Sequence, residues 1–170
     1  NLMKSYYELK DYDQAVVYAE KVLANPTIEN NVKSDAQVLI ARSAMQTGNE
    51  SRAKNAYAEV LKTGKGELAA EALYYDAYFK HKEGSFKASN ESVQKLAKDY
   101  SGYKEYGAKG LVIMAKNFYA LDDAYQATYI LDNVITNFKE FPEVVKEAQA
   151  ELKRIKTMEA KTNASIQPNN

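Results

Sequence analysis

The stretch Tyr6-Tyr7-Glu8-Leu9-Lys10-Asp11-Tyr12-Asp13-Gln14-Ala15 contains the pattern that decides the fold of this chain. Large side chains lead into a polar turn, and a small residue stands four positions after the second turn residue. The same arrangement returns at Ala53, Ser89 and Ala127, so the four small residues are separated by 38, 36 and 38 positions. A recurring spacing in the range of roughly 20 to 50 residues is typical of repeat proteins in which each repeat packs on the next. We therefore predict a row of similar units.

Three further features keep the same place in every repeat. A polar or glycine turn comes just before the small residue, an apolar pair follows seven and eight positions after it, and Met3 or an alanine stands twelve positions before it. Because only a small side chain lets two helices approach closely, we predict that the alanines mark helix crossings. The turns are Lys10-Asp11, Gly48-Asn49, Gly84-Ser85 and Asp122-Asp123; the pairs are Val22-Leu23, Val60-Leu61, Leu96-Ala97 and Val134-Ile135; the preceding residues are Met3, Ala41, Ala77 and Ala115.

The segments between the turns have helical periodicity, with apolar residues three and four positions apart, and none shows a strand signal. We predict an all-α fold, an α-solenoid of about four antiparallel helix pairs over residues 1–157, with a C-terminal capping helix and a frayed tail over 158–170. The capping helix is expected to run from Phe141-Pro142 to about residue 157, with its apolar face made by Val145, Ala148, Leu152 and Ile155. The other helices are predicted over 12–25, 32–47, 50–63, 67–83, 86–100, 104–120 and 123–138.

Composition limits the partners and the chemistry of the 170-residue chain. Lysine plus arginine equals aspartate plus glutamate, at 23 each, which argues against a nucleic-acid backbone or an anionic membrane as the main partner. The chain has no cysteine, so disulfides and thiol chemistry are excluded. In the repeat frame, Asn1 falls in the middle of a helix. We therefore expect a truncated N-terminal repeat, and a fragment of a longer protein whose compartment a missing leader does not reveal.

At these positions the chain resembles the tetratricopeptide repeat family, over roughly residues 1–138. The resemblance implies antiparallel helix pairs wound into a right-handed superhelix, whose first helices line a concave groove for peptides or extended protein segments. It also implies a non-catalytic interaction scaffold without a cofactor. The residues that carry it are Tyr6 to Ala15 with Lys21-Val22-Leu23-Ala24-Asn25-Pro26, then Ile40-Ala41, Ala44, Gly48, Ala53, Tyr57 and Val60-Leu61, and finally Phe118 to Asp123 with Ala127 and Leu131.

Two stretches carry a wider resemblance, Glu71-Ala72-Leu73-Tyr74-Tyr75-Asp76-Ala77-Tyr78 and Leu96-Ala97-Lys98-Asp99-Tyr100. They are similar to the long tetratricopeptide repeat proteins of Bacteroidetes-type bacteria and, more loosely, to periplasmic repeat proteins of outer-membrane assembly and the Tol-Pal system. This resemblance implies the periplasm or cell envelope of a Gram-negative bacterium and a place in a larger envelope complex. A cytoplasmic location remains the alternative.

Tyrosine is unusually frequent, at 14 residues. Six tyrosines fall on predicted helix-pair contacts or on the outer face, namely Tyr6, Tyr12, Tyr18, Tyr57, Tyr125 and Tyr129. Others lie on the first helices, on the side turned away from the pair partner, which is the groove side in the resembled family. Tyrosine offers contact area at a small entropy cost, and arginine or lysine can hold a carboxylate. The predicted site for a partly acidic peptide consists of Tyr7, Arg42, Tyr74, Tyr78, His81, Lys116 and Tyr119, with Lys4, Met45, Lys82 and Val112 on the same face.

The third repeat departs from the pattern, because Asp76 and Lys80 stand where a leucine and a large aromatic are usual. A register slip of one residue would turn Tyr75 and Phe79 inward and leave the charges as an i,i+4 pair on the surface. The alternative is a buried or groove-facing charged pair that helps to hold a ligand.

Catalytic and metal-binding motifs are not found in the sequence. There is no glycine-rich phosphate loop or nucleophile elbow, and His81 is the only histidine, so we predict neither an enzyme nor a metal site. A chaperone-tail carboxylate clamp is not expected, since Lys109, Arg42 and Lys116 lack the accompanying asparagines. Two other functions remain open: a structural spacer within an envelope complex, and an RNA-binding helical repeat, which the zero net charge disfavours.

Overall fold

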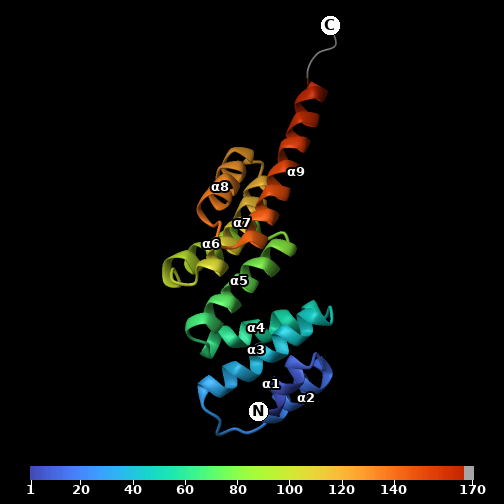
Figure 1. Cartoon of the computed structure of the whole chain (residues 1–170), viewed down its shortest axis with the longest axis vertical. Coiled ribbons are helices and arrows are strands. Elements are labelled where there is room, and N and C mark those ends of the chain that lie inside the picture. The colour runs from blue at the N-terminus through green and yellow to red at the C-terminus, as the bar shows by residue number, and fades with distance from the viewer. Residues whose placement is uncertain (167–170) are drawn as a thin grey trace. The chain divides into compact units, whose positions relative to one another are not determined.

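The computed structural model describes residues 1–166, and these residues form nine helices and no strand (Figure 1). The helices follow one another with short connections, in the order α1 (Leu2–Glu8), α2 (Tyr12–Leu23), α3 (Asn30–Gln46), α4 (Glu50–Thr63), α5 (Gly66–Lys82), α6 (Phe86–Asp99), α7 (Lys104–Ala120), α8 (Ala124–Asn137) and α9 (Pro142–Ile166). The predicted bounds of α2 to α8 agree with these to within two residues.

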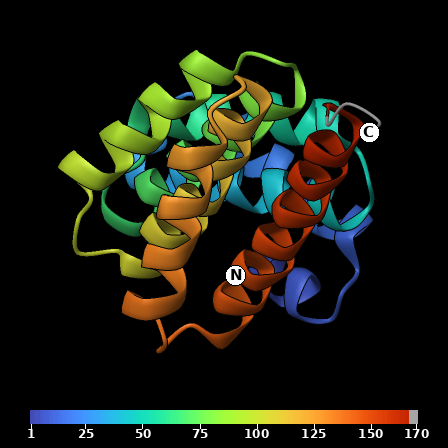
Figure 2. The same ribbon diagram turned by 90° about the horizontal axis from the view of Figure 1, so that it is seen from above.

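The chain divides into two compact units, Asn1–Phe79 and Lys80–Asn170. In the first unit α1 packs on α2, α2 on α3 and α3 on α4. In the second unit α6 packs on α7, α7 on α8 and α8 on α9, and α8 and α9 lie side by side in both views (Figures 1 and 2). Packing of each helix on its neighbour in sequence is the arrangement of an α-solenoid. The predicted fold class, an all-α solenoid of helix pairs, is confirmed.

The four predicted turns share one backbone conformation, which is independent evidence for the repeat. Lys10, Gly48, Gly84 and Asp122 have φ values of 61°, 78°, 82° and 62°. The next residue's N–H donates to the carbonyl five positions earlier in each case: Asp11 to Tyr6, Asn49 to Ala44, Ser85 to Lys80 and Asp123 to Phe118, at 2.8–2.9 Å. This is the Schellman ending of a helix, in which a left-handed residue lets later N–H groups reach the last free carbonyls.

Three of the turns also begin the next helix in the same way. The side chains of Asp11, Asn49 and Asp123 accept a hydrogen bond from the backbone N–H three residues later, at 3.1–3.2 Å. A side-chain acceptor at this N-cap position satisfies one of the four N–H groups that the first helical turn leaves without a partner. The two-residue polar turn therefore both ends one helix and starts its antiparallel neighbour.

The small residues lie at the helix contacts, as predicted. Ala15, Ala53, Ser89 and Ala127 are all 0% exposed, and so are Ala41, Ala77 and Ala115. A side chain added at Gly110 would meet Leu96 and Val93 at 3.2–3.3 Å, so α6 and α7 also approach closely there. Each unit has a core of its own, built around Tyr57 and Val60 in the first and around Leu131 and Val134 in the second.

The last helix is longer than predicted. We expected it to end near residue 157, whereas α9 continues to Ile166. The physical reason is that residues 158–166 contain no glycine or proline, and Met158, Glu159, Ala160 and Lys161 are good helix formers, so nothing in this stretch stops the helix. Within α9, Val144, Ala148 and Ile155 are buried, while Val145 and Leu152 are half-buried. The remaining part of the predicted tail, 167–170, lies outside the described residues.

In the third repeat, Tyr75 and Phe79 turn inward as the register slip expects, whereas Asp76 and Lys80 are not left on the surface. Phe79 is buried in the core of the first unit, and Tyr75 packs against the same core. Asp76 and Lys80 are half-buried, and Lys80 Nζ donates to Ser92 Oγ at 3.0 Å.

Candidate functional site

A buried carboxylate organises the inner side of the first unit. Glu71, on α5, is 3% exposed, and it is bound by Arg42 of α3, whose side chain is 35% exposed. Arg42 Nε donates to Glu71 Oε2 at 2.9 Å, and Nη2 donates to Oε1 at 2.6 Å. This two-point geometry is the strongest form of arginine–carboxylate pairing, and it ties two helices together across 29 residues of sequence.

Tyr57, on α4, also binds Glu71. Its hydroxyl donates to Glu71 Oε2 at 2.8 Å, and the residue is 2% exposed. Burial, and next the charge of Glu71, raise the pKa of Tyr57 above its ordinary value, so the phenol stays protonated and keeps donating. Three helices, α3, α4 and α5, are thus joined at one carboxylate.

An aromatic cluster extends from Tyr57 along α5. The rings of Tyr57 and Tyr75 stack with centroids 4.3 Å apart and an interplanar angle of 10°. Tyr75 in turn makes edge contacts with Tyr74 at 4.9 Å and with Tyr78 at 5.9 Å. The hydroxyl of Tyr78 donates to Glu50 Oε1 at the start of α4, at 3.0 Å. These contacts hold two of the predicted site tyrosines, Tyr74 and Tyr78, in defined positions.

Tyr7 belongs to the same environment, although it comes from α1. It is half-buried, and its ring makes an edge contact with Tyr12, with centroids 5.5 Å apart. Burial raises the pKa of Tyr7, and the positive charge of Arg42 acts in the opposite direction. Of the four predicted site residues of the first unit, Arg42 binds Glu71, Tyr74 and Tyr78 contact Tyr75, and Tyr7 contacts Tyr12.

The second unit has a neutral counterpart of this cluster. Asn117, on α7, is 0% exposed; its amide nitrogen donates to Ser89 Oγ at 2.8 Å and to Asn90 Oδ1 at 2.9 Å. Its amide oxygen lies 2.7 Å from His81 Nδ1, so the assigned amide orientation puts a proton on Nδ1 of the histidine. His81, a predicted site residue, thus completes a buried amide network that joins α5, α6 and α7.

The other predicted site residues of the second unit contact α9. Lys116 Nζ lies 3.1 Å from Glu147 Oε1 in an exposed ion pair. The guanidinium of Arg154 lies over the Tyr119 ring, 5.5 Å from its centroid. Because both partners are side chains of α9, this helix already occupies part of the α7 face that was predicted to meet a ligand.

Sequence reasoning missed the roles of Glu71 and Asn117, whereas it expected Tyr75 to turn inward if the register slipped. A signal for Glu71 was available, because it is the one acid within the apolar run from Leu68 to Leu73. An acid in such a run is either paired or very costly to bury, which is a reason to search for its partner. Asn117 gives a similar signal between Ala115 and Phe118.

Comparison with known sequences agrees with this architecture. The sequence model of the tetratricopeptide repeat family matches residues 1–27. The match and the all-helical fold support a tetratricopeptide repeat protein. No curated protein matches the chain.

Tetratricopeptide repeats generally mediate protein–protein interaction and typically act as non-catalytic scaffolds. Within residues 1–166, no three histidine, cysteine, aspartate or glutamate side chains gather in a way that could hold a metal ion. None of the helices in that part of the chain is long and apolar enough to cross a membrane.

Proposed function

We propose that this tetratricopeptide repeat protein binds an extended segment of a partner protein. The binding face lies in the first unit and is formed by the first helix of each pair, α1, α3 and α5. The contact residues would be Tyr7, Arg42, Tyr74 and Tyr78. Tyr74 and Tyr78 would contribute most of the contact area, while Arg42 would present the outer side of a guanidinium whose inner side is bound to Glu71.

The observation that carries this proposal is the preorganisation of the tyrosines. Tyr7, Tyr74 and Tyr78 are half-buried, so each ring is anchored by the protein and still presents an edge to solvent. Tyr74 and Tyr78 are held by ring contacts with Tyr75, which stacks on Tyr57, and Tyr7 is held by its contact with Tyr12. A partner that binds such rings loses little of their side-chain entropy, because folding has already restricted it.

The paired state of Arg42 changes the ligand chemistry that we propose. A carboxylate on the ligand would meet an arginine that Glu71 already neutralises. We therefore infer that the partner segment is bound mainly by aromatic and backbone contacts, with acidic character as a minor contribution.

The second candidate function is that of a structural spacer. The side-chain contacts of the second unit favour this function for that unit. Lys116 is paired with Glu147, Tyr119 lies under Arg154, and His81 is bound to Asn117. In this unit, side chains proposed for ligand contact are bound by the chain itself, as expected of a unit that only connects other parts. A bacterial envelope complex, implied by the wider resemblance, is the setting we propose for either role. RNA binding by helical repeats remains the least favoured, since the formal net charge is zero.

A peptide-display selection on the described protein tests the proposal. We expect selected peptides to bind the parent protein and to lose at least tenfold in affinity on Tyr74→Ala, with an unchanged circular dichroism spectrum. Tyr125→Ala is the matched control, since Tyr125 is 80% exposed and belongs to the second unit. A selection that yields no specific peptide, or peptides that bind Tyr74→Ala as well as the parent, would favour the spacer.

A further inference from the structure

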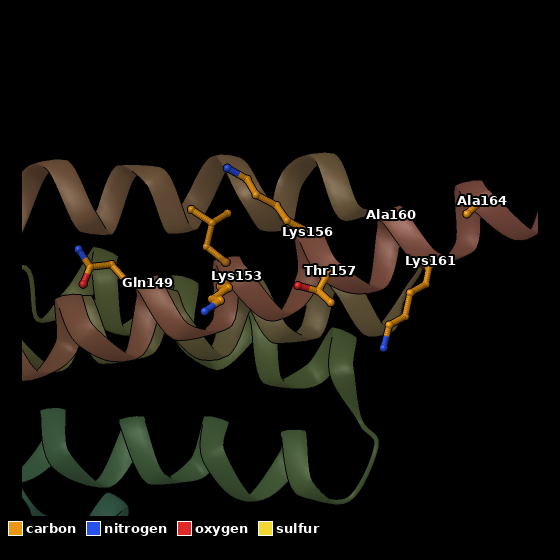
Figure 3. Close-up of a pocket in the computed structure, with 8 residues that line it drawn as sticks. Gln149, Lys153, Lys156, Thr157, Ala160, Lys161 and Ala164 are labelled. Carbon is orange, nitrogen blue, oxygen red and sulfur yellow. The ribbon is translucent and has the colours of Figure 1, made fainter.

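The exposed side of α9 forms a groove that the proposed function does not use. It is shallow and open to solvent, and its eight lining residues all belong to this one helix (Figure 3). Seven of the eight are exposed, and Leu152 is half-buried. The α9 groove is lined by Gln149, Leu152, Lys153, Lys156, Thr157, Ala160, Lys161 and Ala164.

The spacing of these residues defines the shape of the groove. They form two rows with steps of four residues, which are Gln149, Lys153, Thr157 and Lys161 on one side and Leu152, Lys156, Ala160 and Ala164 on the other. The channel between two such rows is the surface into which a ridge of a second helix fits in the commonest class of helix packing. Ala160, Ala164 and Thr157 have small side chains, which permit close approach over the last turns.

The length of the groove also suits a helix. From residue 149 to residue 164 the helix axis rises about 22 Å, at 1.5 Å per residue. A partner helix of about 15 residues would cover it. An extended strand would instead leave backbone polar groups facing alanines and lysine methylenes, where they find few hydrogen-bond partners.

Charge defines the partner further. The groove contains three lysines, Lys153, Lys156 and Lys161, and no acidic residue. Within the described chain these three lysines form no ion pair. None of the four acids of α9 lines the groove: Glu147 pairs with Lys116, Glu151 with Arg154 and Glu143 with Lys146, and Glu159 is also absent from the lining. The α9 groove therefore carries a positive charge, and apolar side chains lie between its lysines.

We propose that the α9 groove docks an acidic amphipathic helix of a partner protein. The partner's apolar ridge would lie between the two rows, and its glutamates or aspartates would flank that ridge and meet the three lysines. Exposed ion pairs of this kind contribute little to affinity and more to selectivity and association rate. Affinity would come from burying Leu152, the alanines and the lysine methylenes.

The probe for this proposal is a designed 18-residue peptide with one leucine stripe flanked by glutamates. A second peptide, with lysine in place of every glutamate, is its control. By fluorescence anisotropy at low salt we expect the acidic peptide to bind at least tenfold more tightly than the basic one. Its circular dichroism should become helical on binding, and its affinity should fall as salt is added.

Charge-reversed variants test the location. The triple variant Lys153→Glu, Lys156→Glu, Lys161→Glu should lose at least tenfold in affinity for the acidic peptide and gain affinity for the basic one. The matched control reverses three exposed lysines elsewhere in the second unit, Lys87→Glu, Lys95→Glu and Lys139→Glu, and should bind as the parent does. Circular dichroism of both variants establishes that they are folded.

Three outcomes would overturn the proposal: no binding of the acidic peptide by the parent, equal losses in the two triple variants, or equally tight binding of a single-stranded oligonucleotide that displaces the peptide. Displacement by the oligonucleotide would mean that the α9 groove binds anions in general and does not select an acidic helix. Tyr74→Ala, the test of the first-unit site, should leave this binding unchanged, so the two proposals can fail separately.

Discussion

The two units of this chain solve the same packing problem with different buried polar groups. The first unit buries a charge, Glu71, and satisfies it with the guanidinium of Arg42 and the hydroxyl of Tyr57. The second unit buries a neutral amide, Asn117, and satisfies it with His81, Ser89 and Asn90. Both groups join three helices, so both align neighbouring elements of the repeat.

The difference shows which unit is more sensitive to the loss of a single partner. A buried charge without its counter-ion carries a desolvation cost that a neutral amide does not. The first unit should therefore depend strongly on one pair, whereas the second spreads a smaller dependence over several hydrogen bonds. The units also differ on their first-helix faces, because α9 covers Lys116 and Tyr119 in the second unit.

The largest effect should come from Arg42→Ala, which removes the guanidinium from the buried Glu71 carboxylate. We expect the free energy of unfolding to fall by about 3 kcal/mol, since removing one partner of a buried ion pair strands the other. Urea unfolding followed by circular dichroism measures it, and native-state hydrogen exchange assigns the loss to the first unit.

Two companions sharpen this result. The double variant Arg42→Met, Glu71→Gln should recover most of the lost stability, because neither charge remains and the glutamine amide oxygen can still accept from Tyr57. Lys146→Ala, which breaks an exposed pair with Glu143 in the second unit, should cost less than about 1 kcal/mol. Equal losses for Arg42→Ala and Lys146→Ala would remove the distinction between the two units.

Overpacking should affect both units alike. Ala41→Leu in the first unit and Ala115→Leu in the second each place a large side chain at a position that is 0% exposed. We expect a loss of about 1–3 kcal/mol for each, measured by thermal and urea unfolding. Ala58→Leu and Ala150→Leu, at exposed positions on α4 and α9, serve as controls. Melting temperatures equal to the parent's would mean that the alanines do not set the distance between helices.

Asn117→Ala should destabilise the second unit by about 1–2 kcal/mol, because it leaves His81, Ser89 and Asn90 without their shared partner. Urea unfolding gives the total, and hydrogen exchange should locate the loss in α6 and α7. Asn133→Ala, at an exposed position on α8, should be close to neutral. A loss as large as that of Arg42→Ala would contradict our comparison of charged and neutral groups.

The smallest expected effect is a pH dependence that belongs to the first unit. The pKa of Tyr57 is raised in the folded protein, so its contribution is complete below the unfolded value of 10.0 and is lost as pH rises above it. Between pH 9 and pH 11 the parent should lose about 1 kcal/mol more than Tyr57→Phe, at up to about 1.4 kcal/mol per pH unit. Parallel stability profiles would mean that the phenol ionises as readily in the folded chain as in the unfolded one.

Much of the fold could be predicted because the repeat depends on local rules. A left-handed residue at Lys10, Gly48, Gly84 or Asp122 and a capping side chain one position later involve contacts within five residues. The alanines at the helix crossings could be predicted too, because the requirement for a small side chain concerns a single position. The end of α9 was misjudged because a helix whose last turns are exposed ends where propensity runs out, and the sequence signals for that are weak.

The candidate site was predictable only in part. Tyr7, Tyr74 and Tyr78 could be chosen from helix faces, because a face follows from spacing. The roles of Arg42 and His81 could not, because each depends on a partner 29 or 36 positions away. Spacing within one helix carries no information about which side chain of another helix will meet it.

The sequence by itself determined an all-helical repeat, with its turns, its small-residue contacts and the faces its helices present, since backbone geometry and side-chain size act over short distances along the chain. Only the tertiary structure decided that Arg42 pairs with Glu71 and that His81 hydrogen-bonds to Asn117. It also decided that α9 contacts one face of α7 while its own positively charged groove stays open. Those outcomes depend on side chains from separate helices converging to satisfy buried polar groups, and that requirement applies only once the helices have packed.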